Sequence, residues 1–373
     1  MRQKTLIALA IVTVPVLAAA IFVPARHGTA LKPVETGPVF PALKDWLSGA
    51  TKLTVTSAGG AIVTLTRTAP AKPGNALPVE GWGLADKSNY PVQESLIRPV
   101  IAGLATLHTT EAKTERPKLY DRLDVEDPSA SKDAKSKLVE LDNPDGASIV
   151  KLIIGKRRYD AVEGGGDAIY IRKPEDERAW LAQPAFDVPG DAMGWIDHKI
   201  VDIDPDKIKS LTLTPAGGKP LVLERAKPDD KLAIRDLPKD ATTRSETPGS
   251  DIAAGFRYLD LLDVRPAAEV TGTASASVEV VTFDGLDATV SLFDQAGGPW
   301  LEVTATGTGD AVKDADDIVA RTKGWAYKVA PQRAKLLESK LADLLTPVAP
   351  AEPKPPAETP APKPVKPAAK PGK

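Results

Sequence analysis

Alternating apolar and polar residues occupy two fifteen-residue segments, 53–67 and 211–225, which carry the same residue at eight of fifteen positions. Each segment has Ala-Gly-Gly at its centre, and glycine supplies the positive φ that a tight turn requires. We therefore predict a β-hairpin in each segment. Chance is a poor explanation for two such similar segments, so we also predict an internal duplication.

The resemblance between the two halves continues along the chain. Apolar residues recur at helical intervals over 92–107 and again over 252–264, which predicts one helix in each copy. Two short strands are then expected on either side of Asp145-Gly146 and of Asp284-Gly285, because these dipeptides favour hairpin turns. A further pair of strands is predicted in each copy, at 168–171 and 179–182 in the first and at 300–304 and 325–329 in the second. An amphipathic segment at 332–345 closes the second copy.

The order of hairpin, helix and several strands predicts an α+β fold with two tandem repeats and mainly antiparallel sheets. A chain of 373 residues is long enough for two domains. Repeat 1 is expected over 42–204 and repeat 2 over 205–346. The boundary falls at Asp204-Pro205, where proline forces extended geometry and the neighbouring aspartates keep the segment in water.

An uncharged run from Thr5 to Val23 follows Arg2 and Lys4 near the amino terminus. As a helix it would be about 28 Å long, close to the ~30 Å hydrocarbon core of a bilayer. Basic residues resist translocation, so we expect a cytoplasmic tip and transmembrane anchor over 1–24 and a linker over 25–41. The chain is then a single-pass protein of the bacterial inner membrane, with its bulk in the periplasm.

A cleaved signal peptide is the alternative for this segment, because Ala18, Ala19 and Ala20 offer a small-residue cleavage site. The apolar part of a signal peptide usually has only about 7 to 15 residues, which favours the anchor. The body of the protein is exported in both cases.

The carboxyl-terminal segment, 347–373, consists mainly of proline, alanine and lysine. It has too few large apolar residues to build a core, so we expect a disordered, extended tail. Its lysines outnumber Glu352 and Glu358. The tail is therefore either a solvated terminus or a segment that contacts the cell wall or another acidic polymer.

Composition and charge narrow the classes of function. The chain has no cysteine, which excludes disulfides, thiolate nucleophiles and a lipoprotein anchor. Its 48 basic and 50 acidic residues are mixed along the sequence, so no broad positive surface is expected for nucleic acid. Hydrophobic residues make up 42% of the chain, enough for a folded core.

No catalytic, cofactor-binding or metal-binding residue is predicted. The three histidines, His27, His108 and His198, lack the spacing of metal ligands. Asp202, Asp204 and Asp206 resemble the start of a calcium loop. However, the glycine and glutamate that such a loop needs further on are replaced here by lysine and leucine.

Glycine-rich segments do not form a phosphate site by the same reasoning. Residues 163–167, Glu-Gly-Gly-Gly-Asp, precede a predicted strand rather than a helix, so we expect the tip of a hairpin. Gly155-Lys156 lacks the rest of a P-loop. The six tryptophans could stack on carbohydrate, but their spread over both copies favours core and interface packing. They are Trp46, Trp82, Trp180, Trp195, Trp300 and Trp325.

Several short motifs resemble those of a known family, the domain of unknown function 4340 proteins. They are Arg116 to Leu123 leading to Asp127-Pro128, Ile153-Ile154-Gly155, Tyr170-Ile171-Arg172, and Trp195 to Ile200. The resemblance implies a membrane-anchored protein, often encoded beside gliding-motility-type ABC transporter components in bacteria. It implies no catalytic residue.

These observations lead to one expectation about function and two alternatives. We expect a non-enzymatic periplasmic module on the inner membrane, an auxiliary subunit of an ABC-type transporter or envelope complex. The first alternative is a periplasmic binder of glycan or lipid that uses a cleft between the repeats. The second is a hydrolase whose site has no recognised motif.

Overall fold

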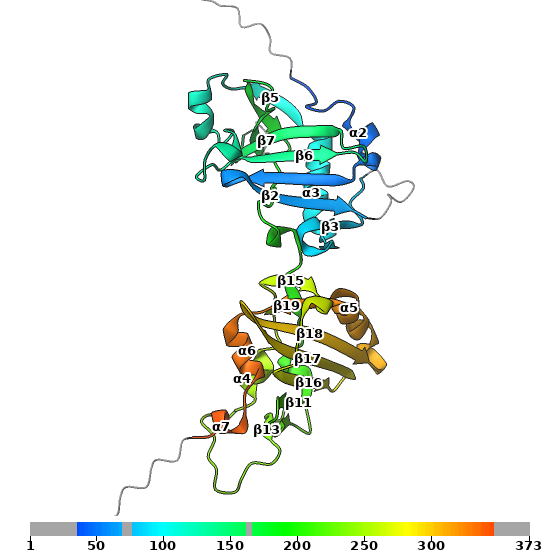
Figure 1. The fold of residues 1–373 in the computed structure, drawn as a ribbon, viewed down its shortest axis with the longest axis vertical. Helices are drawn as coiled ribbons and strands as arrows, with labels where there is room; N and C mark the ends of the chain where they lie inside the picture. Colours follow the sequence, from blue (N-terminus) through cyan, green and yellow to red (C-terminus); the bar gives the residue numbers. More distant parts are fainter. Residues whose placement is uncertain (1–35, 69–76, 162–165, 347–373) are drawn as a thin grey trace, which may run out of the picture.

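The computed structural model describes residues 36–68, 77–161 and 166–346. Two large sheets, each with helices packed against it, lie one after the other along the longest axis of the molecule (Figure 1). The predicted anchor and the predicted tail lie outside the described residues. Within the described ranges, no helix combines the length and apolar character needed to cross a membrane.

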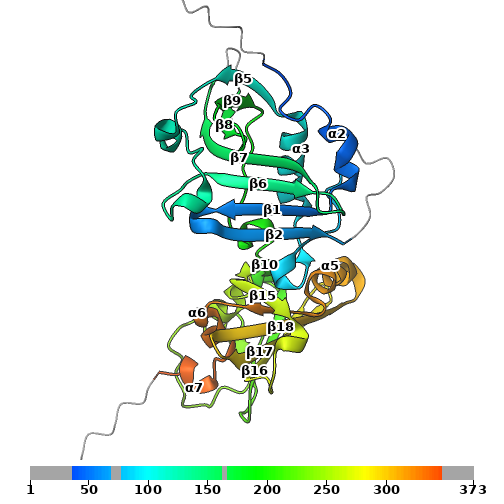
Figure 2. The same ribbon diagram turned by 45° about the horizontal axis from the view of Figure 1, so that its top comes forward.

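The first unit is built on an antiparallel sheet with the strand order β4-β3-β2-β1-β6-β7-β8-β9-β5. The strands are β1 (Lys52–Ser57), β2 (Ala61–Arg67), β3 (Trp82–Leu84), β4 (Tyr90–Pro91), β5 (His108–Ala112), β6 (Lys137–Asp142), β7 (Ser148–Arg158), β8 (Ala168–Arg172) and β9 (Ala179–Gln183). Helix α3 (Glu94–Thr106) lies across one face of this sheet (Figure 2). Its buried residues Ile97, Val100 and Ile101 belong to the same core cluster as Leu53 and Val55 of β1.

The second unit has an antiparallel sheet with the order β13-β12-β11-β16-β17-β18-β19-β15. The strands are β11 (Ile208–Pro215), β12 (Leu221–Glu224), β13 (Ala233–Ile234), β15 (Asp263–Pro266), β16 (Ala276–Thr282), β17 (Leu286–Gln295), β18 (Gly298–Gly307) and β19 (Trp325–Lys328). Besides α3, the described ranges contain α2 (Leu43–Trp46), which precedes β1, and α4 (Ser250–Ala254), α5 (Val312–Thr322), α6 (Pro331–Leu337) and α7 (Leu341–Leu344) of the second unit. The fold is thus mixed α+β with mostly antiparallel sheets, as expected.

Both predicted hairpins are confirmed. Leu53 of β1 lies opposite Leu65 of β2, and Leu211 of β11 lies opposite Leu223 of β12. These four leucines occupy matching positions in the two similar sequence segments. Gly59 and Gly217 adopt φ of 66° and 65° in the turns, a region that a residue with a side chain rarely enters.

Over most of their width, the two sheets have equivalent strands in the same spatial order. The first sheet runs β2-β1-β6-β7-β8-β9-β5 from β2 onward, and the second runs β12-β11-β16-β17-β18-β19-β15 from β12 onward. When each strand of the first sheet is matched with the strand at the same position in the second order, the matched strands also occur in the same order along the chain. The second sheet places α5 between β18 and β19, an element that the sequence analysis did not predict.

The two predicted helices have different outcomes. The helix expected over 92–107 is confirmed as α3. The helix expected over 252–264 is wrong for most of its length, because α4 ends at Ala254 and strands β14 (Leu259–Asp260) and β15 follow. Tyr258, with φ of 53°, interrupts the helical path between them. The apolar residues of this segment are buried as expected, for example Ile252 and Phe256, but they do not lie on one continuous helix.

The closing amphipathic segment, 332–345, is divided between α6 and α7. Lys340 separates them with extended backbone angles, φ of −110° and ψ of 161°.

At the other end of this unit, β10 (Lys199–Val201) pairs with β14. The chain therefore joins the second unit slightly before the expected boundary at Pro205.

Candidate functional site

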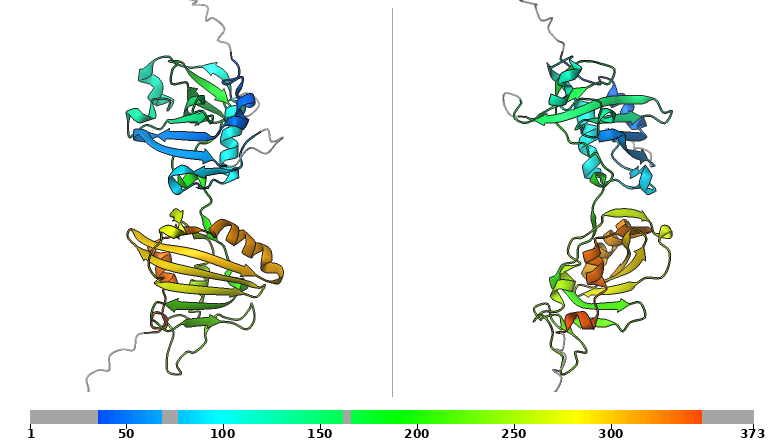
Figure 3. Two further views of the ribbon diagram at one scale, coloured as in Figure 1. Left: turned by 45° about the vertical axis from the view of Figure 1, so that its right-hand side comes forward. Right: turned by 60° about the vertical axis from the view of Figure 1, so that its left-hand side comes forward.

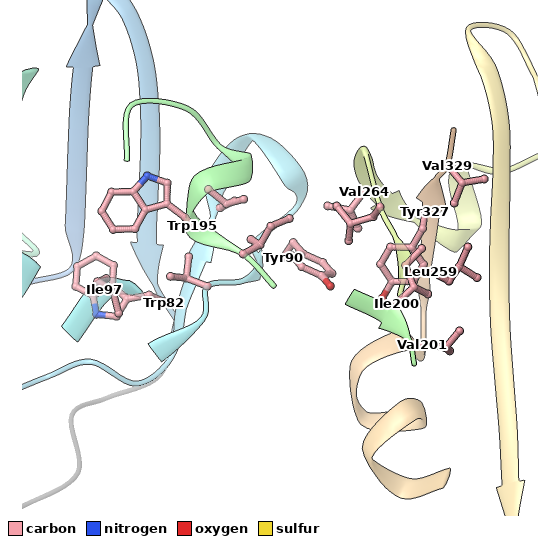
Figure 4. Packing of buried hydrophobic residues seen from close by; sticks show 14 of the residues in the cluster. Trp82, Tyr90, Ile97, Trp195, Ile200, Val201, Leu259, Val264, Tyr327 and Val329 are labelled. Carbon is pink, nitrogen blue, oxygen red and sulfur yellow. The ribbon is translucent and has the colours of Figure 1, made fainter. Parts of the chain in front are cut away.

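The contact between the two units is built around the side chain of Tyr90 in β4 (Figure 4). The centroid of its ring lies 4.9 Å from that of Trp325, with an angle of 83° between the ring planes, and 6.3 Å from that of Tyr327. Such edge-to-face geometry brings the positive edge of one ring to the negative face of the other. Tyr90 is only 4% exposed, so this aromatic contact is desolvated.

An ion pair and the connecting chain complete the contact. Nζ of Lys87 lies 2.6 Å from Oδ1 of Asp263, which joins the short helix after β3 to β15. The backbone N–H of Gln93 donates to the carbonyl of Trp195 at 3.0 Å in the first unit. The carbonyl of His198 already accepts from Leu261 at 2.8 Å in the second. We call Lys87, Tyr90, Asp263, Trp325 and Tyr327 the junction.

Both tyrosines of the junction are neutral phenols at neutral pH. Burial raises the pKa of the hydroxyl of Tyr90 and, more strongly, that of Tyr327. Tyr327 donates its hydroxyl hydrogen to the carbonyl of Arg321 at 2.8 Å, so the phenol is held in its neutral form. The contact therefore combines aromatic packing with the Lys87–Asp263 ion pair, and both tyrosines stay protonated.

The family-like motifs of the first unit meet at Arg172, a residue of β8 that is 8% exposed. Its Nε donates to the carbonyl of Val125 at 3.0 Å, and its guanidinium carbon lies 4.6 Å from the ring centroid of Tyr120. Its Nη1 lies 3.3 to 3.4 Å from three further carbonyls, those of Lys173, Pro174 and Asp176. Arg172 thus holds the segment around 116–128 against one face of the sheet.

A separate apolar cluster forms beneath that segment. Its buried members are Tyr120, Val125, Ile153, Ala168, Tyr170, Ala179 and Leu181. A Cβ atom at Gly155 would lie 2.3 Å from the carbonyl oxygen of Leu123, so the close approach of this segment to β7 requires glycine. Three of the four family-like motifs, those around Tyr120, Ile153 and Tyr170, therefore pack together in this cluster.

The histidines do not come together. His27 lies outside the described residues. His108 is exposed on β5, and its Nδ1 is 3.4 Å from the carbonyl of Thr106. His198 is also exposed, with Nε2 2.9 Å from the carbonyl of Met193.

Two of the three aspartates of the calcium-like motif, Asp202 and Asp204, have local structural roles through their side chains. Asp204 caps the short helix that follows it, accepting from the N–H of Asp206 at 3.1 Å, and pairs with Arg257 at 3.1 Å. Asp202 accepts from the N–H of Tyr258 at 3.4 Å. Asp202 and Asp204 line a polar pocket of about 240 Å³ that also contains Arg321. In the described ranges, no three His, Cys, Asp or Glu side chains are grouped so that they could hold a metal ion.

The glycine-rich segment joins two paired strands. Residues 163–165 lie outside the described part, but Arg158 of β7 pairs with Ala168 of β8 on either side of it. Asp167 contacts Arg157 at 3.2 Å. The flanking strands β7 and β8 thus pair antiparallel, as a hairpin requires, while most of the predicted tip lies outside the described residues.

Tryptophan packing is mixed. Trp82, Trp195 and Trp300 are buried, with exposures of 3%, 0% and 6%. Trp325 belongs to the junction, whereas Trp46 is 59% exposed. The three buried rings are therefore not accessible for stacking on carbohydrate, and for them the packing interpretation is confirmed.

Arg265 of β15 was not singled out from the sequence. Its guanidinium carbon lies 3.9 Å from the ring centroid of Trp300, while Nε and Nη2 are buried without a hydrogen-bond partner. The stacking joins β15 to β18, two strands that lie on either side of β19 in the sheet and are distant in the chain. No local motif marks it, and the same is true of Tyr90 against Trp325.

Comparison with models of protein families places the chain in a family. No curated protein matches the chain. The family model described as "Domain of unknown function (DUF4340)" matches residues 82–275, more than half of the chain. The match begins in β3 and ends just before β16, so it includes the Arg172 arrangement and much of the junction. The chain belongs to the DUF4340 family, whose domain has no assigned function.

Proposed function

We propose that this protein is a membrane-anchored periplasmic accessory protein, an auxiliary subunit of an ABC-type transporter or envelope complex that works by surface contact. The observation that carries this proposal is the position of the two ends of the described chain. The described part begins at Thr36 in the first unit and ends at Thr346 in the second, just after helix α7, and the two units lie at opposite ends of the long axis (Figure 3). An anchor ahead of Thr36 would hold the first unit near the bilayer and present the second unit farther out.

The proposed location is the bacterial inner membrane, with a cytoplasmic tip and a single transmembrane anchor over 1–24. Its support is the uncharged run from Thr5 to Val23 behind Arg2 and Lys4. Both sheets would then face the periplasm. The absence of cysteine is compatible with that compartment.

We further propose that the two units are repeats of one ancestral α+β unit. The shared strand order and the matching leucine pairs of β1-β2 and β11-β12 support this origin. An experimental structure tests it. Residues 53–171 should superpose on residues 211–329 with equivalent strands aligned, and a superposition that aligns different strands would refute the duplication.

A pull-down from native membranes tests the accessory role. The full chain, tagged after Lys373, is solubilised in mild detergent, and the proteins that purify with it are identified. The matched control replaces residues 1–24 with a cleavable signal peptide, which exports the same body without an anchor. We expect ABC transporter subunits with the anchored chain and a clear loss of them with the control. Recovery of no membrane protein by either form would contradict the proposal.

A binder of glycan or lipid remains the alternative, and one surface favours the lipid form. Between α3 and residues 184–189 lies a mainly apolar groove of about 520 Å³, which includes Leu96, Pro99, Phe186 and Val188. This groove belongs to the first unit alone, whereas the expected cleft between the repeats contains Tyr90 packed on Trp325. A rise in melting temperature with lipid or glycan, in the absence of protein partners, would support the alternative.

A further inference from the structure

We infer that an apolar and cationic surface beside helix α2 rests on the lipid bilayer. This surface consists of Phe40, Lys44, Trp46, Ile149 and Lys173, and we call it the α2 patch. The inference rests on the proposed membrane anchor. It assigns the patch one occupant, the surface of a bilayer that contains anionic lipid.

The exposure of Trp46 is the first observation. Helix α2 buries Leu43 and the next residue after the helix, Leu47, is also buried, with exposures of 3% and 1%. Trp46 between them is 59% exposed and takes no part in the core. It lines an open depression of about 530 Å³ together with Phe40, Ile149 and Lys173.

The chemistry of the patch is the second observation. Nζ of Lys173 lies 5.3 Å from the ring centroid of Phe40, and Lys44 is exposed next to Trp46 in the sequence. Tryptophan is enriched at the level of lipid headgroups, where its ring is partly in water and partly in hydrocarbon. Lysines are attracted to anionic headgroups. Asp45 offsets part of this positive charge.

The place where the described chain begins is the third observation. Val39 donates its N–H to the carbonyl of Leu107 at 2.9 Å, and Thr109 donates to the carbonyl of Gly37 at 2.9 Å. These bonds fix the start of the chain on the first unit, close to α2 (Figure 1). From Val23 to Thr36 the chain can span at most about 45 Å. The anchor would therefore keep the patch at a high effective concentration near the bilayer.

Site-specific fluorescence tests the contact in the full chain, which has no native cysteine to compete for a label. Ala147 is exposed and lines the same depression, so Ala147→Cys carries an environment-sensitive dye beside the patch while none of the five patch residues is replaced. The chain is reconstituted in vesicles of equal parts phosphatidylcholine and phosphatidylglycerol. Some of the lipid carries a nitroxide near the headgroup. Flotation of the vesicles shows independently whether the chain is anchored.

Two reference sites and one patch variant complete the design. Dyes at Ile62→Cys in the first unit and Tyr258→Cys in the second report exposed positions outside the patch, with native exposures of 58% and 62%. We expect several-fold stronger quenching at position 147 than at either reference. We also expect the quenching at 147 to fall to the reference level when Trp46→Ser is added.

Each other outcome has a distinct meaning. Flotation of the chain with equal quenching at all three sites would overturn the patch contact while leaving the anchor intact. A blue-shifted, unquenched dye at 147 would show that protein covers the patch, which also overturns the inference. A chain that does not float would refute the anchor proposed above and the contact with it.

Discussion

Arg172 is a charged residue inside an apolar environment, and its cost is offset by the carbonyl groups around it. An arginine with 8% exposure is tolerated only when its donors are satisfied, because an unpaired buried charge is strongly destabilising. Here the donors reach four carbonyls, and the guanidinium stacks on Tyr120. The family-like motif around Arg172 thus has a structural explanation.

Arg172→Ala should therefore destabilise the protein by about 2 to 4 kcal/mol, since it leaves buried carbonyls without donors. Urea unfolding followed by circular dichroism measures the change. Arg158→Ala is the matched control, because Arg158 is exposed on β7, and it should change the free energy of unfolding by less than about 0.5 kcal/mol. Equal effects of the two substitutions would contradict the role given to Arg172.

Asp284, in the turn between β16 and β17, is predicted to contribute stability that depends on pH. Oδ2 of Asp284 lies 2.8 Å from Nζ of Lys207, and this bond, with a second one from Thr282, lowers the pKa of the carboxyl. Its contribution is therefore fully present above the ordinary value of about 3.9 and is lost as the pH falls through the lower pKa of the folded state.

Asp284→Asn should accordingly lower the free energy of unfolding at neutral pH. The difference from the native chain should shrink as the pH falls below about 4, because the carboxyl of the unfolded chain takes up a proton first. It should disappear below the lower pKa of the folded state, where the native carboxylate is protonated as well. Urea unfolding at a series of pH values provides the measurement. Asp310→Asn, at an exposed position, is the control and should have a small effect throughout. A difference for Asp284→Asn that stays constant with pH would exclude this explanation.

At the scale of elements, the hairpins could be predicted because their determinants are local. Alternation and the turn glycines lie within fifteen residues of each other, so no knowledge of the rest of the chain is needed. Helix α5 has a weaker hydrophobic pattern in the sequence than the two hairpins. Its buried stripe consists of Ala315, Ile318 and Thr322, whose small or polar side chains hardly stand out from a strongly charged segment.

The junction could not be predicted from sequence at all. Tyr90 precedes α3, and Trp325 follows α5 in the other unit, so their contact depends on how two complete sheets are placed. For the same reason, strands β14 and β15 were read as the continuation of a helix. Their apolar spacing suits a helix, but Val264 pairs with Tyr327 of β19, a contact made far along the chain.

Tyr90→Ser should loosen the connection between the units while leaving both folded. Its aromatic contacts with Trp325 and Tyr327 are worth about 0.5 to 1.5 kcal/mol each beyond the area they bury, enough to change an open population roughly tenfold. Spin labels at Ile62→Cys and Tyr258→Cys, one in each unit, report the distance between them. We expect a broader distance distribution for Tyr90→Ser.

Tyr159→Ser is the matched control, because Tyr159 is 71% exposed in the first unit and lies outside the junction. It should leave the distribution unchanged. Circular dichroism checks that both sheets remain folded in each variant. An unaltered distribution in Tyr90→Ser would show that the junction does not fix the arrangement.

At the scale of the whole molecule, the proposed anchor and the positions of the chain ends lead to a topology prediction. A reporter that is active only outside the cytoplasm, fused after Thr346, should be active and should stay with the membrane fraction. Activity in the soluble fraction, with residues 1–20 removed, would instead establish the signal-peptide alternative. The matched control replaces Arg2 and Lys4 with glutamate, which should reduce correct orientation.

The small size of the junction has a mechanical consequence. A load applied between Thr36 and Thr346 would be transmitted from one sheet to the other through Tyr90, the Lys87–Asp263 pair and the covalent chain between Trp195 and His198. Within each sheet, by contrast, whole ladders of backbone hydrogen bonds share the force. Under tension the two units should part first, and the protein would lengthen at low force as a compliant tether whose two sheets remain intact.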